Sequence, residues 1–185
     1  TMARIALDVD EVACKTLERC LDTLNARLGT DYKPDVFHEW DIFQCIPKRA
    51  ADMLNSIFLE RDIWDEMLPP NDAQAIVKLM VRDGNDVLFI SNCHTKTHDW
   101  KSDWLRRVYP FVPRDNHIYT AHKKLLLVDY LIDDNVDWLR ESTATRILMD
   151  KPWNWDAHTG FDFRVKSLTE AWDKICELEK ERDRD

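Results

Sequence analysis

The stretch from Ala3 to Val12 constrains the fold of this chain more than any other part of its sequence. An apolar run of strand-like length ends there in two aspartates, Asp8 and Asp10, with one residue between them. Residues i and i+2 of a strand share a face, and where a strand ends both acids can point into one pocket. Acids at the carboxyl end of a buried strand lie where open α/β sheets bind ligands. Taken alone, the stretch is also compatible with a solvated turn rich in aspartate.

Later parts of the chain add polar side chains to this pattern. Two further short apolar runs each end in polar residues, and a lysine lies ten residues before the first member of an acid pair. In chain order these residues are Ser91 and Asn92, then Lys123, then Asp133 and Asp134. Three predicted strands therefore end in side chains of the kind that bind phosphate or metal.

Four carboxylates that meet a phosphate dianion repel one another. Two unit charges about 4 Å apart interact by about 4 kcal/mol at the effective dielectric constant of a protein surface. The cluster becomes favourable around Mg²⁺, a hard cation that takes a few carboxylates, phosphate oxygens and water as ligands. Lysine and serine can then hold the transferring phosphoryl oxygens, and an aspartate can be the nucleophile through an aspartyl-phosphate. The pattern therefore indicates phosphate-ester chemistry with Mg²⁺ as the cofactor.

These residues resemble the four motifs of the haloacid dehalogenase (HAD) superfamily of phosphohydrolases. The motifs are matched, in chain order, by residues 8–12, Ser91, Lys123 and 133–134. The resemblance implies that Asp8 is the nucleophile and a metal ligand. It implies that Asp10 protonates the leaving alkoxide as a general acid, then serves as the base for water, with its carbonyl oxygen on the metal. Glu11 stands where many relatives carry glycine. Its side chain is expected to face the cap, the segment inserted after this first motif.

The same resemblance assigns the remaining polar residues. Asp134 is expected as a direct metal ligand and Asp133 as the carboxylate beside it, with the reverse order left open. The expected phosphate-binding residues are Ser91, Asn92 through its backbone N–H, and Lys123. Lys124 competes with Lys123 for this role, but the ten-residue gap to Asp133 favours Lys123.

Composition limits the possible partners. The net charge of −9 argues against broad nucleic-acid binding, which needs a basic face, and a small monophosphate fits better than a long polyanion. No apolar run approaches the roughly eighteen residues of a membrane span, so no membrane partner is expected. The expected first strand begins almost at once, so we expect no signal peptide. Five cysteines without metal-knuckle spacing favour free thiols in a reducing cytoplasm. A homodimer is left open.

The alternation of strands and helices predicts an α/β fold with a parallel sheet and helices on both faces. Beyond the strands already described, short strands are expected near 118–121 and 146–149. Helices are expected after the acid motif up to Gly29, from Asp72 to Gly84, through Trp104, and after a capping box at Ser167–Glu170. The charged tail 177–185 is expected to fray.

The segment between the first two strands is far longer than an ordinary βα loop of about two to six residues. Its pattern is helical, and prolines divide it into short pieces. In HAD-like enzymes an insertion after the first motif forms a cap over the active site. We therefore expect a HAD-like Rossmannoid three-layer sandwich made of 1–12 and 72–185, with a small helical cap at 13–71. The 185 residues suit one such core with an insertion.

Four segments carry a narrower resemblance, to the 5′(3′)-deoxyribonucleotidases. They are residues 38–43, 63–69, 131–134 and 149–154. In that family cap aromatics form the nucleobase pocket, which implies that Trp40 and Trp64 bind substrate, the alternative being that they pack inside the cap. A stacked aromatic contributes about 1–3 kcal/mol per base. Thr16 stands where relatives place another aromatic, which leaves base preference open.

The sequence thus predicts a Mg²⁺-dependent phosphomonoesterase whose partner is a small nucleoside monophosphate, of the deoxyribonucleotide type. The same chemistry on a sugar phosphate or a polynucleotide end is the alternative within enzymes. A receiver-type phosphoacceptor domain is disfavoured because its lysine follows its acid pair, whereas Lys123 precedes Asp133. A non-catalytic nucleotide-binding module is disfavoured because every catalytic position is filled.

Overall fold

Six parallel strands form one sheet in the order β3-β2-β1-β4-β5-β6. The computed structural model describes residues 2–184, so Thr1 and Asp185 of the expected core lie outside the described residues. The strands are β1 (Arg4–Asp8), β2 (Asp86–Ser91), β3 (His117–Tyr119), β4 (Tyr130–Asp133), β5 (Thr145–Met149) and β6 (Phe163–Val165). The first strand is central, since β1 pairs with β2 on one side and with β4 on the other. The predicted α/β class is confirmed.

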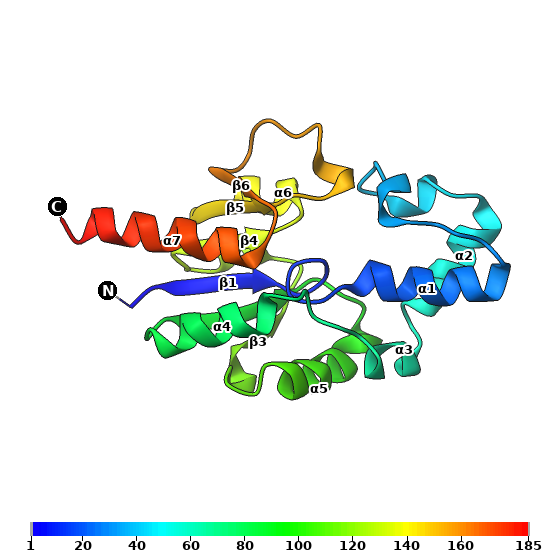
Figure 1. The fold of residues 1–185 in the computed structure, drawn as a ribbon, viewed down its shortest axis with the longest axis horizontal. Helices are drawn as coiled ribbons and strands as arrows, with labels where there is room; N and C mark the ends of the chain where they lie inside the picture. Colours follow the sequence, from blue (N-terminus) through cyan, green and yellow to red (C-terminus); the bar gives the residue numbers. More distant parts are fainter. Residues whose placement is uncertain (1, 185) are drawn as a thin grey trace.

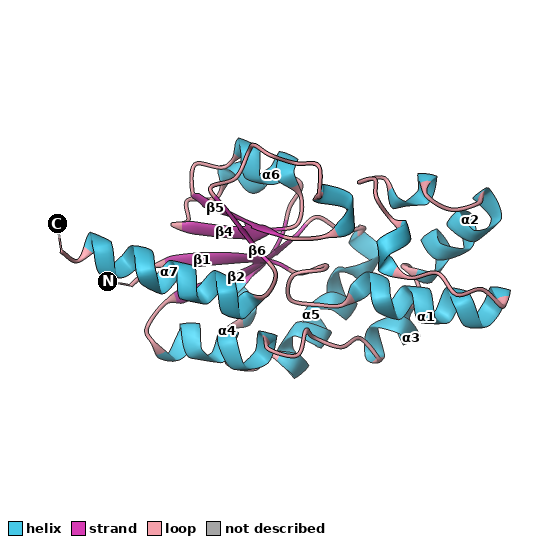
Figure 2. Cartoon of the chain, turned by 45° about the horizontal axis from the view of Figure 1, so that its top comes forward, coloured by secondary structure: helices cyan, strands magenta, loops and turns pink. Residues whose placement is uncertain are grey.

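Helices cover both faces of this sheet (Figures 1 and 2). They are α1 (Thr16–Leu28), α2 (Lys48–Ile57), α3 (Arg61–Asp65), α4 (Ala73–Arg82), α5 (His98–Val108), α6 (Val136–Glu141) and α7 (Leu168–Arg182). The helices α4, α5 and α7 lie on one face, and α4 packs against both α7 and β2. The other face is covered by α6, which packs on β4 and β5. No helix within residues 2–184 has the length and apolar character needed to cross a membrane.

The side chains on the two faces of β1 pack into two separate parts of the core. Ile5 and Leu7 belong to the large cluster that includes residues of α4 and α7, whereas Ala6 belongs to a smaller cluster with Leu131 and Leu148 near α6. This follows from the period of two along a strand, which sends successive side chains to opposite faces. Burial of one such aliphatic side chain stabilises the fold by about 1.5–3 kcal/mol. The core thereby holds the end of β1, and the acids that follow it, in a fixed place.

The inserted segment 13–71 lies at the carboxyl ends of the strands. Its helices α1 and α2 pack against each other and form a lobe beside the sheet (Figure 1). The short helix α3 packs instead on α5, where Arg107 donates to the carbonyl of Asp65 at 3.1 Å. The indole of Trp104 donates to the carbonyl of Met67 at 2.9 Å. The last part of the insertion is therefore tied to the core, and the cap boundaries stay a prediction.

Local signals placed most helix ends correctly. Gly29 ends α1 with φ 66°, and its N–H donates to the carbonyl of Asn25 at 2.8 Å. The hydroxyl of Ser167 accepts from the N–H of Glu170 at 3.1 Å, as a capping box requires, but the Glu170 carboxylate accepts from Lys166. The five cysteines carry free thiols, as expected.

The expectation that the tail frays from residue 177 is wrong within the described residues, because α7 continues to Arg182. Glu179 explains the difference. Its carboxylate accepts a hydrogen bond from the hydroxyl of Tyr130 at 2.5 Å and pairs with Arg182 at 2.9 Å. The charged end of the helix is thus attached to the sheet. The strand β6 and the helix α6 were not predicted from the sequence.

Candidate active site

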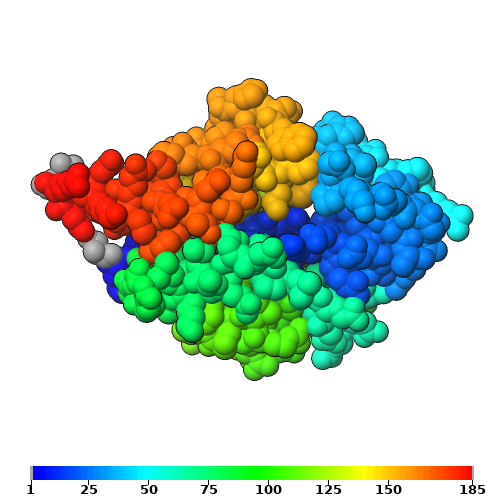
Figure 3. Space-filling view, in the orientation of Figure 1, coloured from blue at the N-terminus to red at the C-terminus, as the bar shows by residue number. Residues whose placement is uncertain are grey.

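Polar residues from three adjacent strands meet at one edge of the sheet. Asp8 ends β1, Ser91 ends β2 and Asp133 ends β4, and these strands are neighbours. The chain runs from β1 to β2 on one side, whereas β4 lies on the other, so this is a switch point where open α/β sheets bind ligands. A pocket of about 750 Å³ opens there, lined both by strand ends and by residues of the segment 13–71. In Figure 3 the blue amino-terminal residues show between the orange surface of the core and the blue-cyan lobe.

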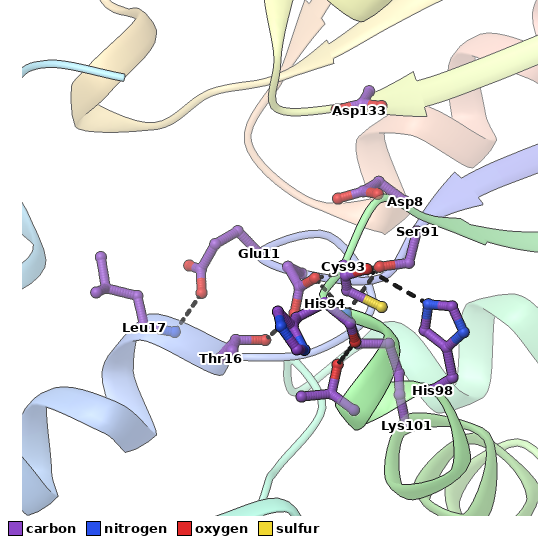
Figure 4. Close-up of polar contacts among 12 residues, drawn as sticks. Asp8, Glu11, Thr16, Leu17, Ser91, Cys93, His94, His98, Lys101 and Asp133 are labelled. Carbon is purple, nitrogen blue, oxygen red and sulfur yellow. Dashed lines mark hydrogen bonds and ion pairs between the residues drawn. The ribbon is translucent and has the colours of Figure 1, made fainter. Parts of the chain in front are cut away.

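A tight turn after β1 directs the second aspartate into the pocket. The N–H groups of Ala13 and Cys14 both donate to the carbonyl of Val9, at 3.0 and 2.8 Å. Glu11 lies at φ 63°, in the left-handed region that favours glycine. Its carboxylate accepts from the N–H of Leu17 at 2.6 Å, near the start of α1, as Figure 4 shows. The unusual backbone of Glu11 is therefore held by a contact with the first helix of the insertion, in agreement with the expected orientation of its side chain.

Lys123 lies between two of the predicted acids. Its Nζ is 2.6 Å from Asp8 and 2.7 Å from Asp133, and its side chain is 2% exposed. Burial lowers the pKa of Lys123, but the charges of Asp133 and Asp8 outweigh it, so the pKa is raised and the group is an ammonium. Lys124 points elsewhere and pairs with Glu141 at 3.4 Å. The structure thus brings Lys123, rather than Lys124, to the acids.

The acid cluster holds three carboxyl groups and one ammonium group. Burial raises the pKa of Asp8 to about 7, against the charge of Lys123, and repulsion from Asp133 and Asp10 adds to the increase. Burial also raises the pKa of Asp134, with further repulsion from Asp133 and Asp8. Oxygen Oδ2 of Asp134 accepts a hydrogen bond from the indole of Trp153 at 2.9 Å. One ammonium does not neutralise the three carboxylates, which leaves a site for a further cation.

The donor set of this cluster fits Mg²⁺. Asp8, Asp133 and Asp134 each offer a carboxylate oxygen, all within 4.8 Å of one another, and all three residues are buried. Hard oxygen donors of this kind suit magnesium better than a soft metal. Both oxygens of Asp133 already accept hydrogen bonds, from Lys123 at 2.7 Å and from the N–H of Asn135 at 2.9 Å. That favours Asp134 over Asp133 as a direct ligand, an order that stays a prediction.

The carboxylate of Asp10 points away from this cluster. Its Oδ1 accepts from the hydroxyl of Thr16 at 2.7 Å, and its Oδ2 accepts from the ammonium of Lys101 at 2.5 Å and from Ser91 at 3.3 Å. Burial favours a higher pKa for Asp10, but the charge and hydrogen bond of Lys101, with the bond from Thr16, lower the pKa overall. Ser91 itself is buried, whereas Asn92 is exposed and lines the pocket.

Sequence reasoning missed Lys101. This lysine lies on α5, is 1% exposed and also donates to the hydroxyl of Ser91 at 2.7 Å. A signal was present, because Trp104 and Leu105 lie three and four residues later on the same buried face of the helix. A lysine on an apolar helical stripe is almost never fully buried unless it has a partner. The stripe in α5 thus pointed to a buried lysine.

The aromatic residues of the pocket differ in exposure. Trp40 and Trp64 both line it, but Trp40 is 54% exposed and Trp64 only 3%. The ammonium of Lys101 lies 5.0 Å from the centre of the Trp64 ring. Phe43 and Phe58, which sequence reasoning did not select as site residues, also line the pocket and meet edge to face with centroids 6.2 Å apart. The substrate-binding role of Trp40 and Trp64 stays a prediction.

Comparison with known proteins shows the family of this chain. The model of the family described as 5′ nucleotidase, deoxy (Pyrimidine), cytosolic type C protein matches residues 2–181. A Bacillus subtilis 5′(3′)-deoxyribonucleotidase is 26% identical over 153 residues, which cover 81% of this chain and 86% of that protein. A Staphylococcus epidermidis protein to which the same activity is ascribed is 27% identical over 161 residues, or 85% of this chain and 88% of the relative.

Solved structures share the fold. A haloacid dehalogenase-like hydrolase from Streptococcus pneumoniae aligns with a TM-score of 0.59 and 11% identity, over 94% of this chain and 98% of that chain. A HAD-type protein from Bacillus subtilis, solved with bound magnesium, aligns with a TM-score of 0.58 and 12% identity, over 95% and 99% of the two chains. At such low identities the likeness shows the fold alone, and it confirms the expected HAD-like sandwich.

Proposed function

Because the chain belongs to the family of 5′ nucleotidases, deoxy (Pyrimidine), cytosolic type C, and is therefore an enzyme of the phosphatase class, we propose that it is a Mg²⁺-dependent phosphomonoesterase for deoxyribonucleoside monophosphates. One observation carries this proposal. The Lys123 ammonium lies 2.6 Å from Asp8 at the switch point of the sheet, beside two further buried acids. This arrangement supports a nucleophilic role for Asp8, a phosphate-binding role for Lys123 and a metal site at the acids.

The first half of the reaction transfers the phosphoryl group to the protein. A carboxylate oxygen of Asp8 attacks phosphorus and forms a P–O bond, while the ester P–O bond of the substrate breaks. The charge of a bound phosphate dianion opposes the effect of Lys101 on the pKa of Asp10 and favours its protonated form, which gives its proton to the leaving ribose oxygen, so the nucleoside departs neutral. Asp8 then carries the phosphoryl group, and Asp10 is left as a carboxylate.

The second half returns the protein to its starting state. The Asp10 carboxylate takes a proton from water as the water oxygen attacks phosphorus. The bond between phosphorus and the Asp8 oxygen breaks, and inorganic phosphate leaves. Asp10 is protonated again, so protons balance over the cycle. A single residue thus serves as acid and then as base.

The remaining polar groups bind the charge of the phosphate. Lys123, the hydroxyl of Ser91 and the backbone N–H of Asn92 are proposed to hold its nonbridging oxygens. The carboxylates of Asp8 and Asp134 and the carbonyl of Asp10 would hold Mg²⁺, with Asp133 beside them, and the bound ion would offset the negative charge of phosphate and acids. Without that cation, the raised pKa values of Asp8 and Asp134 show that the site disfavours full ionisation.

The choice of substrate follows from the pocket and from the relatives. Segment 13–71, which we propose as a cap over the core 1–12 and 72–185, lines the pocket with flat rings that can stack a base. Trp40 and Trp64 are proposed to contact the nucleoside. The net charge of −9 also favours a small monophosphate. The free thiols fit a reducing compartment such as the cytoplasm.

A phosphate-release screen tests the proposal. The protein is assayed with deoxyribonucleoside and ribonucleoside 5′- and 3′-monophosphates, sugar phosphates and p-nitrophenyl phosphate, with Mg²⁺ or with excess chelator. The expected result is turnover only with the metal, with kcat/KM highest for deoxyribonucleotides. Faster release from hexose phosphates than from dUMP, dTMP and dGMP would remove the nucleotide class and leave a phosphatase for another small phosphate.

A further inference from the structure

Lys101 is a second buried lysine of the pocket, and the roles assigned so far leave it unused. We propose that Lys101 is a positioning residue, which holds the carboxylate of Asp10 in the orientation needed for its proton transfers. The inference rests on the proposed function, because it assigns to Asp10 the role of acid and base. Lys101 comes from α5, far from Asp10 in the sequence, and approaches the turn after β1 from below in Figure 4.

The hydrogen bonds around Asp10 fix its carboxylate plane. Thr16 donates to Oδ1 at 2.7 Å, and Lys101 donates to Oδ2 at 2.5 Å. If Lys101 were absent, Oδ2 would keep only the longer bond from Ser91, at 3.3 Å. A carboxylate held firmly on one oxygen, and only by a long bond on the other, can rotate more freely about its terminal bond, since such torsions are broad. Lys101 is therefore the group that stops this rotation.

Lys101 is itself held in place. Its Nζ also donates to the hydroxyl of Ser91 at 2.7 Å and lies 5.0 Å from the centre of the Trp64 ring. Trp64 lies on α3, which Arg107 of α5 anchors through the carbonyl of Asp65 at 3.1 Å. The ammonium thus has a defined position set by two helices. It links the proposed phosphate ligand Ser91 to the proposed acid Asp10.

Stability alone does not account for this lysine. Taking an ammonium out of water is costly, and replacing a buried ion pair by apolar groups of similar volume is often neutral or stabilising. An apolar residue on the buried stripe of α5 would pack against Trp64 without that cost. A buried charge directed at a reactive carboxylate therefore indicates a role in the chemistry.

The two buried lysines, Lys101 and Lys123, contact different acids. Lys123 lies against Asp8 and Asp133, whereas Lys101 lies against Asp10. Loss of Lys101 should therefore impair proton transfer and leave the attack by Asp8 largely intact. The two effects can be separated by the leaving group. A ribose alkoxide needs a proton from Asp10, whereas p-nitrophenolate is a stable anion that leaves without one.

The experiment compares Lys101→Met with the wild-type protein on both kinds of substrate. With the deoxyribonucleotide that the screen ranks first, we expect single-turnover release of the nucleoside to fall about 100-fold, the cost of a misplaced catalytic group. With p-nitrophenyl phosphate, we expect the first burst of p-nitrophenol, one per protein molecule, to keep a near wild-type rate. Lys96→Met is the matched control, because this exposed lysine also lies over a tryptophan, Trp100, at 5.7 Å.

A double-mutant cycle with Asp10→Asn provides the second measurement. If Lys101 acts through Asp10, Lys101→Met should have little further effect on nucleotide cleavage once Asp10 is replaced. Lys101→Gln keeps a donor and should retain more nucleotide activity than Lys101→Met. It also serves as the test variant if the methionine variant has lost the far-ultraviolet circular dichroism of the wild type. Equal losses on both substrates, or additive effects in the cycle, would overturn the inference. A wild-type protein inert toward every phosphate monoester would instead overturn the proposed function.

Discussion

The ammonium of Lys123 lies 2.6 Å from the carboxyl group of Asp8, within a cluster of three acids that would repel one another when ionised. The pair is almost fully buried, so water does little to screen the remaining repulsion. Protons and a metal ion are the two ways to relieve it. They compete for the same oxygens, and this competition makes the metal effect depend on pH.

We expect the stabilisation by Mg²⁺ to grow as pH rises from about 4 to about 7. The folded-state pKa of Asp8, about 7, is above its ordinary value of 3.8, so the folded protein holds this proton more tightly than the unfolded chain. Metal-free protein therefore loses the contribution of Asp8 to stability across that window. Bound metal needs the ionised carboxylate, and it stabilises only the folded state.

Thermal unfolding with Mg²⁺ or with chelator, at several pH values from 5 to 8, measures this effect. The difference in Tm should be smallest at the acidic end of the series and should level off above about pH 7. Asp8→Asn, which cannot ionise, should flatten the dependence. A difference in Tm that stays constant over the whole series would contradict the assignment of Asp8 to the metal site.

Asp8→Asn should abolish turnover while leaving the fold intact. The amide has nearly the same shape, but it is a poor nucleophile, so we expect about a hundredth of the wild-type rate or less. Asp10→Asn should cost about 10²–10⁴-fold, the contribution of a general acid. Phosphate release gives the rates, and circular dichroism checks the fold. Robust turnover by the Asp8→Asn variant would show that Asp8 is not the nucleophile.

The residues found from the sequence lie where local signals are strong. Asp8, Ser91 and Asp133 end apolar runs of strand length, and strand periodicity is a local property. The order of the strands then brings them together. The alternation of strands and helices was also enough to predict the parallel sheet. The short elements β6 and α6, with three and six residues, are too brief for periodicity to show.

Lys101 and Trp64 show what a local pattern leaves out. Lys101 reads as one charge on an amphipathic helix, and only the packing of α5 against the turn after β1 makes it a partner of Asp10. Trp64 was selected as a flat ring, but its low exposure depends on how α3 packs on α5. Phe58 was not selected from the sequence as a site residue, and its place in the pocket depends on the path of the segment 13–71. Tertiary contacts decide all three.

Glu11 offers a test that separates charge from helix capping. Its carboxylate accepts from the N–H of Leu17 at 2.6 Å and lies 3.7 Å from Lys151, within the pocket for the phosphate. Removing the negative charge should tighten phosphate binding, so Glu11→Gln and Glu11→Ala should both lower KM. Only the alanine variant removes the acceptor at the start of α1, which should destabilise the fold by about 1 kcal/mol.

Steady-state kinetics and thermal unfolding of the two Glu11 variants measure these effects. Glu11→Gln serves as the control for charge, since its amide oxygen can still accept from Leu17. Both variants keep the left-handed backbone, so neither gains from relief of strain. A higher KM in both variants would mean that Glu11 contacts the substrate productively, contrary to the expected repulsion.

The last prediction concerns substrate choice. In the proposed mechanism the strand ends hold only phosphate and metal, so we expect the rings of the segment 13–71 that line the pocket to discriminate between substrates. Trp40 is half exposed there, and Phe58 is half-buried beside Phe43. We expect Trp40→Ala and Phe58→Ala to raise KM for nucleotides far more than for p-nitrophenyl phosphate or a sugar phosphate. A lost base contact should cost about 1–3 kcal/mol.

Trp64→Ala completes the series, because its ring both lines the pocket and lies over Lys101. We expect a higher KM for nucleotides together with a lower kcat, since the variant also frees the lysine that faces Asp10. We further expect deoxyribose over ribose by about ten- to a hundredfold in kcat/KM, because an apolar wall would leave a 2′-hydroxyl without a partner, at about 1–3 kcal/mol. If KM rises equally for nucleotides and for p-nitrophenyl phosphate in the Trp40 and Phe58 variants, these two rings only pack the segment 13–71. Nucleotide recognition would then have to lie elsewhere in the pocket.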